Sequence, residues 1–285
     1  MSIPVRVVVT VFVLVSSGAS FAYDWTGKTG VVTLTESAEV TDADLEVVTN
    51  LTGIVLDSKD VVLDFKNTMP VVLPCYVNGN GLLRKSGTGD LFLGNPGAGF
   101  TVVNNRGTHC ADYYTKAGVT IAKGAFYMPQ EGTTRYWYGP LTLGEGTMVY
   151  THTGAATGVD SLHGAGTITN TVVPKLSDYP LNSKMLIISE YGSYDKSDFS
   201  GVIGGNISIY CSGDVRLSGT DSTFLSSVEV GSAYPCNEKS ACLRFKTIGH
   251  LGVPSSLGLG TQFSFGVRMG SDYGGKFYYE GEGDE

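Results

Sequence analysis

The sequence predicts an all-β protein built as a parallel β-solenoid, and three observations lead to that prediction. Short apolar segments recur along the chain between turns that are rich in glycine, asparagine and aspartate. A glycine-punctuated unit at 79–93 returns in related form at 161–169 and 212–219. No long window follows the 3.6-residue period of an amphipathic helix.

The expected strands follow one another closely through the chain. They are 31–35, 45–48, 54–56, 61–65, 91–93, 119–121, 141–143, 147–150, 167–169, 185–188, 207–210, 228–230, 263–267 and 276–279. Most are rich in Val, Ile, Leu, Phe or Thr and are bounded by residues that favour turns. Strands this short suit one face of a coil whose rungs pair with the rungs before and after them. A sandwich or barrel would also contain many short strands, but those strands would differ in chemistry from one another.

The first 22 residues have the layout of a secretory signal peptide. Arg6 supplies a positive charge, an apolar run spans 7–15, and Ser20 and Ala22 are the small residues that a signal peptidase reads. The apolar run is shorter than the about 20 residues of a membrane-spanning helix. We therefore expect cleavage after Ala22 and an extracellular or cell-surface location, with periplasmic transit if the source is a Gram-negative bacterium. A buried N-terminal strand is the alternative for this segment.

Glycine density divides the mature chain into two expected parts. Residues 23–75 contain fewer glycines, and we expect them to form an N-terminal cap and the first β-rungs. Residues 76–285 then form the repeat region. One rung cannot bury its apolar face alone, so an array of this kind needs several rungs and a cap.

Composition and charge exclude some classes of partner. The chain has 19 Lys and Arg against 27 Asp and Glu, which gives a net charge of −8. This acidic balance offers no basic footprint for nucleic acid. No segment after the signal peptide is apolar enough for an integral membrane helix. Only 16% of the residues are charged, and 39 of 285 are glycine, as is typical of a sheet-rich extracellular protein.

The five cysteines are Cys75, Cys110, Cys211, Cys236 and Cys242. An oxidising compartment favours disulfides, and an odd number leaves one thiol free or intermolecular. Cys236 and Cys242 flank a short polar stretch, so we expect that pair to form a disulfide; Cys75 with Cys110 is the weaker candidate. Neither spacing fits a zinc site, and no metal or other cofactor is expected.

Several of these segments resemble a known repeat. The pattern Gly-x-Leu-x-Lys-x-Gly-x-Gly-x-Leu-x-Leu at 81–93, followed by 119–124, resembles the autotransporter-associated β-strand repeat. Segments 161–170, 199–207, 248–258 and 277–281 are similar to other parts of such units, so the resemblance covers roughly residues 79–281. It implies a right-handed single-stranded parallel β-helix that is exported, surface-displayed or released, with no catalytic residues.

The chain departs from the autotransporter pattern at its C-terminal end. Autotransporters end in a membrane barrel of alternating strands, whereas this sequence ends in the acidic stretch 280–285. The units also diverge, because Lys85 of the first unit has no counterpart in the third. We expect either the N-terminal part of a longer product or a freely released relative without a translocator.

Residues with catalytic potential are scattered. The four histidines lie far apart in sequence, and there is no Gly-x-Ser-x-Gly nucleophile motif. Polysaccharide-cleaving β-helices usually show clustered Asp or Lys and Arg residues on one face, whereas here only isolated candidates occur, such as Asp160, Asp214 and Arg216. We expect a secreted non-enzymatic scaffold or adhesin-like surface module. The alternative is a secreted polysaccharide-binding or polysaccharide-cleaving β-helix.

A run of aromatic residues is the best candidate for a contact surface. It consists of Tyr136, Trp137 and Tyr138, with Tyr113, Tyr114 and Tyr127 nearby in sequence. Exposed rings of this kind stack on sugar faces or anchor protein partners, so surface glycans or extracellular proteins are the expected partners. The alternative for the same run is ordinary strand alternation, with the rings stacked between successive rungs.

Overall fold

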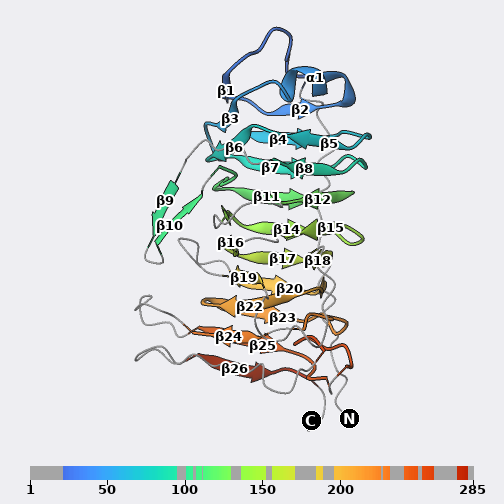
Figure 1. Cartoon of the computed structure of the whole chain (residues 1–285). Coiled ribbons are helices and arrows are strands. Elements are labelled where there is room, and N and C mark those ends of the chain that lie inside the picture. Colours follow the sequence, from blue (N-terminus) through green and yellow to red (C-terminus); the bar gives the residue numbers. More distant parts are fainter. Residues whose placement is uncertain are drawn as a thin grey trace, which may run out of the picture.

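Within the described residues the chain is all-β, and nearly all of its strands are parallel (Figure 1). The computed structural model describes residues 22–94, 101–104, 107–110, 112–129, 136–151, 156–170, 184–188, 196–225, 227–231, 241–249, 252–259 and 275–281. Residues 1–21 of the predicted signal peptide and the strand expected at 263–267 lie outside this set.

The strands form four sheets. The three-stranded sheet contains β1 (Val31–Leu34), β3 (Gly53–Leu56) and β6 (Tyr76–Gly79). The six-stranded sheet contains β5 (Val71–Leu73), β8 (Leu91–Leu93), β12 (Ala125–Tyr127), β15 (Met148–Tyr150), β18 (Thr167–Thr169) and β21 (Val202–Ile203). The ten-stranded sheet contains β2 (Ala38–Val40), β4 (Val62–Phe65), β7 (Leu82–Lys85), β11 (Gly118–Ile121), β14 (Leu141–Leu143), β17 (Leu162–Gly164), β20 (Ser197–Phe199), β23 (Asp214–Leu217), β25 (Cys242–Phe245) and β26 (Lys276–Tyr279). The seven-stranded sheet contains β9 (Thr101–Asn104), β10 (Gly107–Cys110), β13 (Tyr136–Tyr138), β16 (Thr157–Val159), β19 (Lys184–Ile188), β22 (Ile207–Cys211) and β24 (Val228–Val230).

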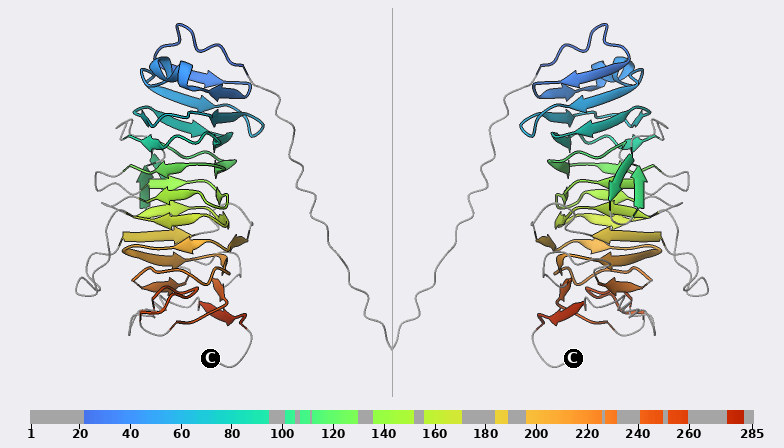
Figure 2. Two further views of the ribbon diagram at one scale, coloured as in Figure 1. Left: turned by 90° about the vertical axis from the view of Figure 1, so that its right-hand side faces the viewer. Right: turned by 90° about the vertical axis from the view of Figure 1, so that its left-hand side faces the viewer.

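The chain visits the three larger sheets in a repeating order. Strands β11, β12 and β13 lie in the ten-, six- and seven-stranded sheets, and β14 to β16 and then β17 to β19 repeat that order. We call one such circuit a layer. Each strand pairs in parallel with its counterpart in the next layer, so the layers stack along the long axis of the molecule (Figures 1 and 2). The hairpin of β9 and β10 is antiparallel and lies on the flank of the stack (Figure 2).

The prediction of a strand at 45–48 is wrong, because this segment is helical. A 3-10 turn, η1 (Asp42–Asp44), leads into the short helix α1 (Leu45–Val48). The backbone N–H and the hydroxyl of Thr41 both donate to the Asp44 carboxylate, at 2.8 and 2.6 Å, and so fix the start of the turn. Two apolar valines at the end of the segment resemble a strand locally, but the Thr-x-x-Asp pattern before them favours a helix start.

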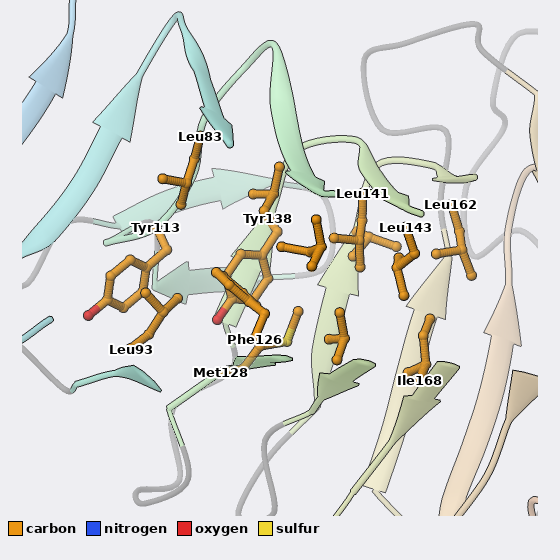
Figure 3. Close-up of a cluster of buried hydrophobic side chains, with 14 of the residues drawn as sticks. Leu83, Leu93, Tyr113, Phe126, Met128, Tyr138, Leu141, Leu143, Leu162 and Ile168 are labelled. Carbon is orange, nitrogen blue, oxygen red and sulfur yellow. The ribbon is translucent and has the colours of Figure 1, made fainter. Parts of the chain in front are cut away.

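The interior is formed by columns of side chains, each contributed by the same strand position in successive layers. One inward column of the ten-stranded sheet runs Val40, Phe65, Lys85, Ile121, Leu143, Gly164, Phe199, Leu217, Phe245, Tyr279. Inward side chains of the other sheets meet these columns, as Phe126 and Ile168 do in Figure 3. Burying each aliphatic or aromatic side chain contributes about 1.5–3 kcal/mol, so the stacked columns are the main source of stability.

Gly164 is the residue in this column that has no side chain, and its backbone explains why. Its φ is +94°, and a Cβ built there would lie 1.9 Å from the carbonyl oxygen of Leu143. In the next layer Phe199 is in register with Gly164 and is 1% exposed. The close backbone approach, together with the positive φ, therefore requires glycine at this position.

Replacing Gly164 by Ala tests this requirement. Gly146 is the matched control, because its φ is +74° but nothing lies within 4 Å of a Cβ built there. We expect Gly146→Ala to lower the free energy of unfolding by about 1–2 kcal/mol, the cost of the left-handed backbone alone. Gly164→Ala adds a backbone clash and should cost about 3 kcal/mol or more. Urea denaturation followed by far-UV circular dichroism measures both; equal losses would contradict the close approach.

Lys85 occupies an interior position between Phe65 and Ile121 and is fully buried. Its aliphatic stem continues the apolar column, while its Nζ donates a hydrogen bond to the carbonyl oxygen of Gly87. Burial lowers the pKa of the Lys85 ammonium to about 8, and the carboxylates of Asp90 and Asp64 oppose that shift. Keeping the Lys85 ammonium charged in the interior therefore lowers the free energy of unfolding.

The pH dependence of unfolding tests the burial of Lys85. The folded chain loses this proton at about pH 8 and the unfolded chain at 10.5, so stability rises with pH across that window. The rise should be at most about 1.4 kcal/mol per pH unit. Lys85→Met should remove this part of the rise, whereas Lys123→Met, at an exposed site, should retain it. Parallel curves for the parent chain and Lys85→Met in urea titrations at pH 8 to 10.5 would contradict the assignment.

Candidate functional site

The outer face of the six-stranded sheet carries no charged side chain in its described strands. Strand alternation places the interior residues of these strands on one side and these outward residues on the other: Val72, Phe92, Ala125, Tyr127, Met148, Tyr150, Thr167, Thr169, Val202. In-register pairing stacks Val72, Phe92, Tyr127, Tyr150 and Thr169 in one column. In a protein with 46 charged residues (19 + 27), an uncharged strip across six strands is a candidate contact surface.

The three rings of this column are stacked on one another, and we call Phe92, Tyr127 and Tyr150 the aromatic fin. The ring centroids of Phe92 and Tyr127 are 4.1 Å apart with an interplanar angle of 15°, and those of Tyr127 and Tyr150 are 4.3 Å apart at 5°. The inner faces of the rings therefore cover each other. The fin presents ring edges and hydroxyls outward, and a ring face remains only at each end, towards Val72 and Thr169.

The end of the fin at Val72 opens onto exposed apolar surface. Val72 is 59% exposed and Met69 is 54% exposed, which makes them two of the most exposed large hydrophobic residues of the described chain. The half-buried Asp90 precedes Phe92 by two residues and lies on the same side of the strand. This end of the fin thus combines an aromatic face, an apolar floor and a carboxylate.

The phenol of Tyr127 is held in its neutral form. Burial raises the pKa of Tyr127 to about 12, and the neighbouring Tyr150 and Asp90 act in the same direction. The Tyr127 hydroxyl therefore acts as a neutral hydrogen-bonding group at ordinary pH.

The outer face of the ten-stranded sheet has the opposite character. Its central outward column runs Glu39, Asp64, Arg84, Thr120, Thr142, His163, Asp198, Arg216, Arg244, Tyr278. Arg216 pairs with Asp198 at 3.4 Å and with Glu280 at 2.7 Å, and Arg244 lies 4.9 Å from the ring centroid of Tyr278. Each exposed ion pair is worth only about 0–1 kcal/mol, so this face is a solvated, internally compensated surface.

The charged residues that the sequence offered for catalysis, Asp160, Asp214 and Arg216, are held in ion pairs or hydrogen bonds. Asp214 pairs with Arg244 at 3.1 Å and with Lys196 at 3.4 Å. Burial works to raise the pKa of Asp214, but the two cations outweigh it and hold that pKa below its usual value. Asp160 is 4% exposed and accepts a hydrogen bond of 3.0 Å from the Tyr114 hydroxyl. Arg216 belongs to the ion-paired column described above. The structure does not bring Asp160 and Asp214 into one strand or column.

The aromatic run predicted from the sequence is divided between interior and surface. Tyr138 is fully buried and stacks on buried Tyr113 with a centroid separation of 6.5 Å, as Figure 3 illustrates, so neither ring contributes to a contact surface. The backbone of Tyr136 and Trp137 belongs to β13, but their side chains lie outside the described part, so their contact role stays a prediction. Tyr127, named only as a neighbour of that run, lies at the centre of the fin.

The sequence reasoning missed Phe92 and Tyr150, although a signal for both was present. Phe92 lies between Leu91 and Leu93, which point inward, and Tyr150 follows Val149, which also points inward. Strand alternation therefore places both rings on the outer face. An aromatic residue at an outward strand position is exposed unless a neighbouring layer covers it. What the sequence did not supply was the register that stacks these rings.

The described cysteines are thiols. Cys75, Cys211 and Cys242 are buried and free, and burial raises the pKa of the Cys75 thiol to about 12. Each predicted disulfide, Cys236–Cys242 and Cys75–Cys110, requires one of these free thiols, so neither is formed in this structure; Cys236 and the side chain of Cys110 lie outside the described residues. In the described ranges, no three His, Cys, Asp or Glu side chains gather as a metal site would require. No helix among those ranges is long and apolar enough to span a membrane.

No family model, no curated protein and no solved structure matches this chain. The candidate site therefore rests on the geometry of the fin and its surroundings.

A double-mutant cycle tests the stacking in the fin. Tyr127→Ala and Tyr150→Ala should each destabilise the chain, and the pair should couple by about 0.5–1.5 kcal/mol in the free energy of unfolding. Tyr127→Ala combined with Thr142→Ala, on the ten-stranded sheet, is the control and should be additive within about 0.5 kcal/mol. Denaturant unfolding of the six chains gives both couplings; similar values in the two cycles would argue against direct ring stacking.

Proposed function

We propose that this chain is an exported, right-handed single-stranded parallel β-helix of the autotransporter-associated repeat type, which acts as a non-enzymatic, adhesin-like surface scaffold. The repeating order of sheets and the in-register parallel pairing support the β-helix. The signal-peptide layout of the first 22 residues supports export.

The observation that carries the adhesin-like function is the contrast between two outer faces of the same stack. The ten-stranded sheet carries ion pairs that compensate one another on its outer column, whereas the outward side chains of the six-stranded sheet are uncharged: half-buried aromatic, aliphatic and threonine residues and the exposed Val72. Exposing apolar side chains to water has a cost in free energy, so an uncharged strip of this kind favours a contact surface. The stack then serves to present the strip at a fixed position.

The alternative of polysaccharide cleavage has weaker support. Cleavage needs two carboxyl groups that face each other across a glycosidic bond. Asp214 is held by two cations and Asp160 by a tyrosine hydroxyl. Binding without cleavage fits these residues better.

Export is tested at the predicted cleavage site. The exported protein should begin at Tyr23, because Ala22 and Ser20 supply the small residues that the peptidase reads. Ala22→Arg should block processing and retain the precursor, while Thr26→Arg, beyond the site, should leave processing intact. N-terminal sequencing and intact mass of the exported and cell-bound fractions measure this. A chain that stays in the cytoplasm with its first 22 residues intact would contradict the proposal.

Surface retention is tested with charges placed on the two outer faces. Tyr127→Asp combined with Tyr150→Asp should reduce the fraction of mature chain bound at the producing cell surface several-fold, because desolvating a carboxylate in an apolar contact is costly. Thr142→Asp is the control on the ten-stranded sheet and should leave that fraction unchanged. Fractionation and quantitative immunoblotting give the ratio, with circular dichroism to check folding. Equal retention of both variants would remove the strip from the proposed function.

A further inference from the structure

The Val72 end of the fin is a shelf built from two adjacent layers. Val72 is paired in register with Phe92 of the next layer, and the exposed Met69 comes three residues before Val72 in the chain. A phenylalanine ring extends well beyond the methyl groups of a valine, so the face of Phe92 turned towards Val72 is not covered by that side chain. Its opposite face is covered by Tyr127 at 4.1 Å.

Buried polar contacts hold the two sides of the shelf together. The side-chain amide of Asn67, which is fully buried, donates 2.7 and 3.1 Å hydrogen bonds to the carbonyl oxygens of Met69 and Asp90. The backbones approach closely beside it, since a Cβ on Gly89 would lie 2.4 Å from the Met69 carbonyl oxygen. The shelf is therefore set by the backbone and by one buried side chain, and a ligand would not need to order it.

The chemistry of the shelf fits a neutral sugar. An aromatic face and an apolar floor suit the C–H face of a pyranose ring, and the Asp90 carboxylate accepts hydrogen bonds from its hydroxyls. The hydroxyls of Tyr127 and Tyr150 continue the polar edge along the fin, and burial raises the pKa of Tyr127 to about 12. An anionic polymer would meet both this carboxylate and a net charge of −8.

The size of the strip argues against a second copy as the occupant. Six strands spaced about 4.8 Å apart, each about 10 Å long, give a flat area of roughly 300 Å2. A stable protein interface needs about 800 Å2 from each partner, so the strip is too small by more than half. Its long, narrow outline suits a single linear polymer chain that runs along the axis of the stack.

We propose that the shelf of Met69, Val72, Asp90 and Phe92 binds a sugar ring of a neutral linear polysaccharide, whose chain continues along the fin. This inference rests on the proposed function and names the class of ligand that the adhesin-like surface takes. Phe92 supplies the stacking face, Asp90 the hydroxyl acceptor, and Met69 with Val72 the apolar floor.

Native affinity electrophoresis of the mature chain in gels that contain a polysaccharide tests the shelf. The probes are hydroxyethyl cellulose, xylan and galactomannan as neutral polymers, and polygalacturonate as the anionic one. We expect at least one neutral polymer to retard the chain and polygalacturonate to leave it unaffected. Phe92→Ala should weaken binding about tenfold or more, because it removes the stacking face. Val72→Arg should weaken it similarly by filling the shelf without touching the interior.

Val31→Arg is the matched control, because Val31 is 52% exposed on a strand of a different sheet and its substitution should leave the retardation unchanged. No retardation by any neutral polymer, or equal retardation of the parent and Val72→Arg chains, overturns the shelf as a sugar site. Retardation by polygalacturonate alone overturns it as well. If surface retention by cells persists in that case, the adhesin-like function stands with a different ligand; if retention is also absent, both proposals fail.

Discussion

The constraint on which the rest of the structure depends is in-register parallel pairing between layers. Pairing of this kind places each strand position directly over its counterpart one layer away, at a spacing of about 4.8 Å. A side chain is therefore packed mainly against residues of the same column, and each column has to be compatible from end to end. The column from Val40 to Tyr279 shows how strictly this holds, since its exceptions, Lys85 and Gly164, each have a local compensation.

The same constraint shapes the outer faces. Stacked like charges repel at this spacing, so a charged column is stable only where opposite charges or rings intervene. Arg216 and Arg244 are direct neighbours in register, and their repulsion is offset by Asp198, Glu280, Asp214 and the ring of Tyr278. A column of rings has no such conflict, because parallel rings attract at 4.1–4.3 Å. Columns thus separate into charged and aromatic faces.

The local sequence predicted strands correctly where short apolar segments lie between turns. Elsewhere the prediction of the strands was incomplete. Leu141–Leu143 and Ile207–Cys211 carry enough β-branched or aliphatic residues to be recognised as strands. Thr157–Val159, with a glycine at its centre, does not, and it is a strand because both neighbouring layers pair with it. The helix α1 is the reverse case, in which a short capping pattern before Leu45 outweighs the valines that follow.

The fin was harder to predict than the strands because its members are neighbours only in space. Phe92, Tyr127 and Tyr150 come from three layers, and the register that aligns them follows from the pairing of whole strands. Residues that are adjacent in a strand alternate between its two sides, so a surface column takes its members from several strands and not from one run of sequence. A contact surface on a stack of this kind is therefore read across layers, by strand position.

Glycines in the turns between strands explain how such a surface can be rigid although the outward residues differ from layer to layer. At Gly81, Gly87 and Gly201 a Cβ would lie within 2.4 Å of a carbonyl oxygen in the preceding layer, so the backbones of adjacent layers are in close contact. These contacts fix where one layer sits on the next and leave the outward positions between corners free to change. The β9–β10 hairpin shows where additional chain is accommodated, on the flank and away from the six-stranded face (Figure 1). A face held between fixed corners loses little conformational freedom on contact, so even a narrow aromatic strip can retain most of the free energy of its contacts as affinity.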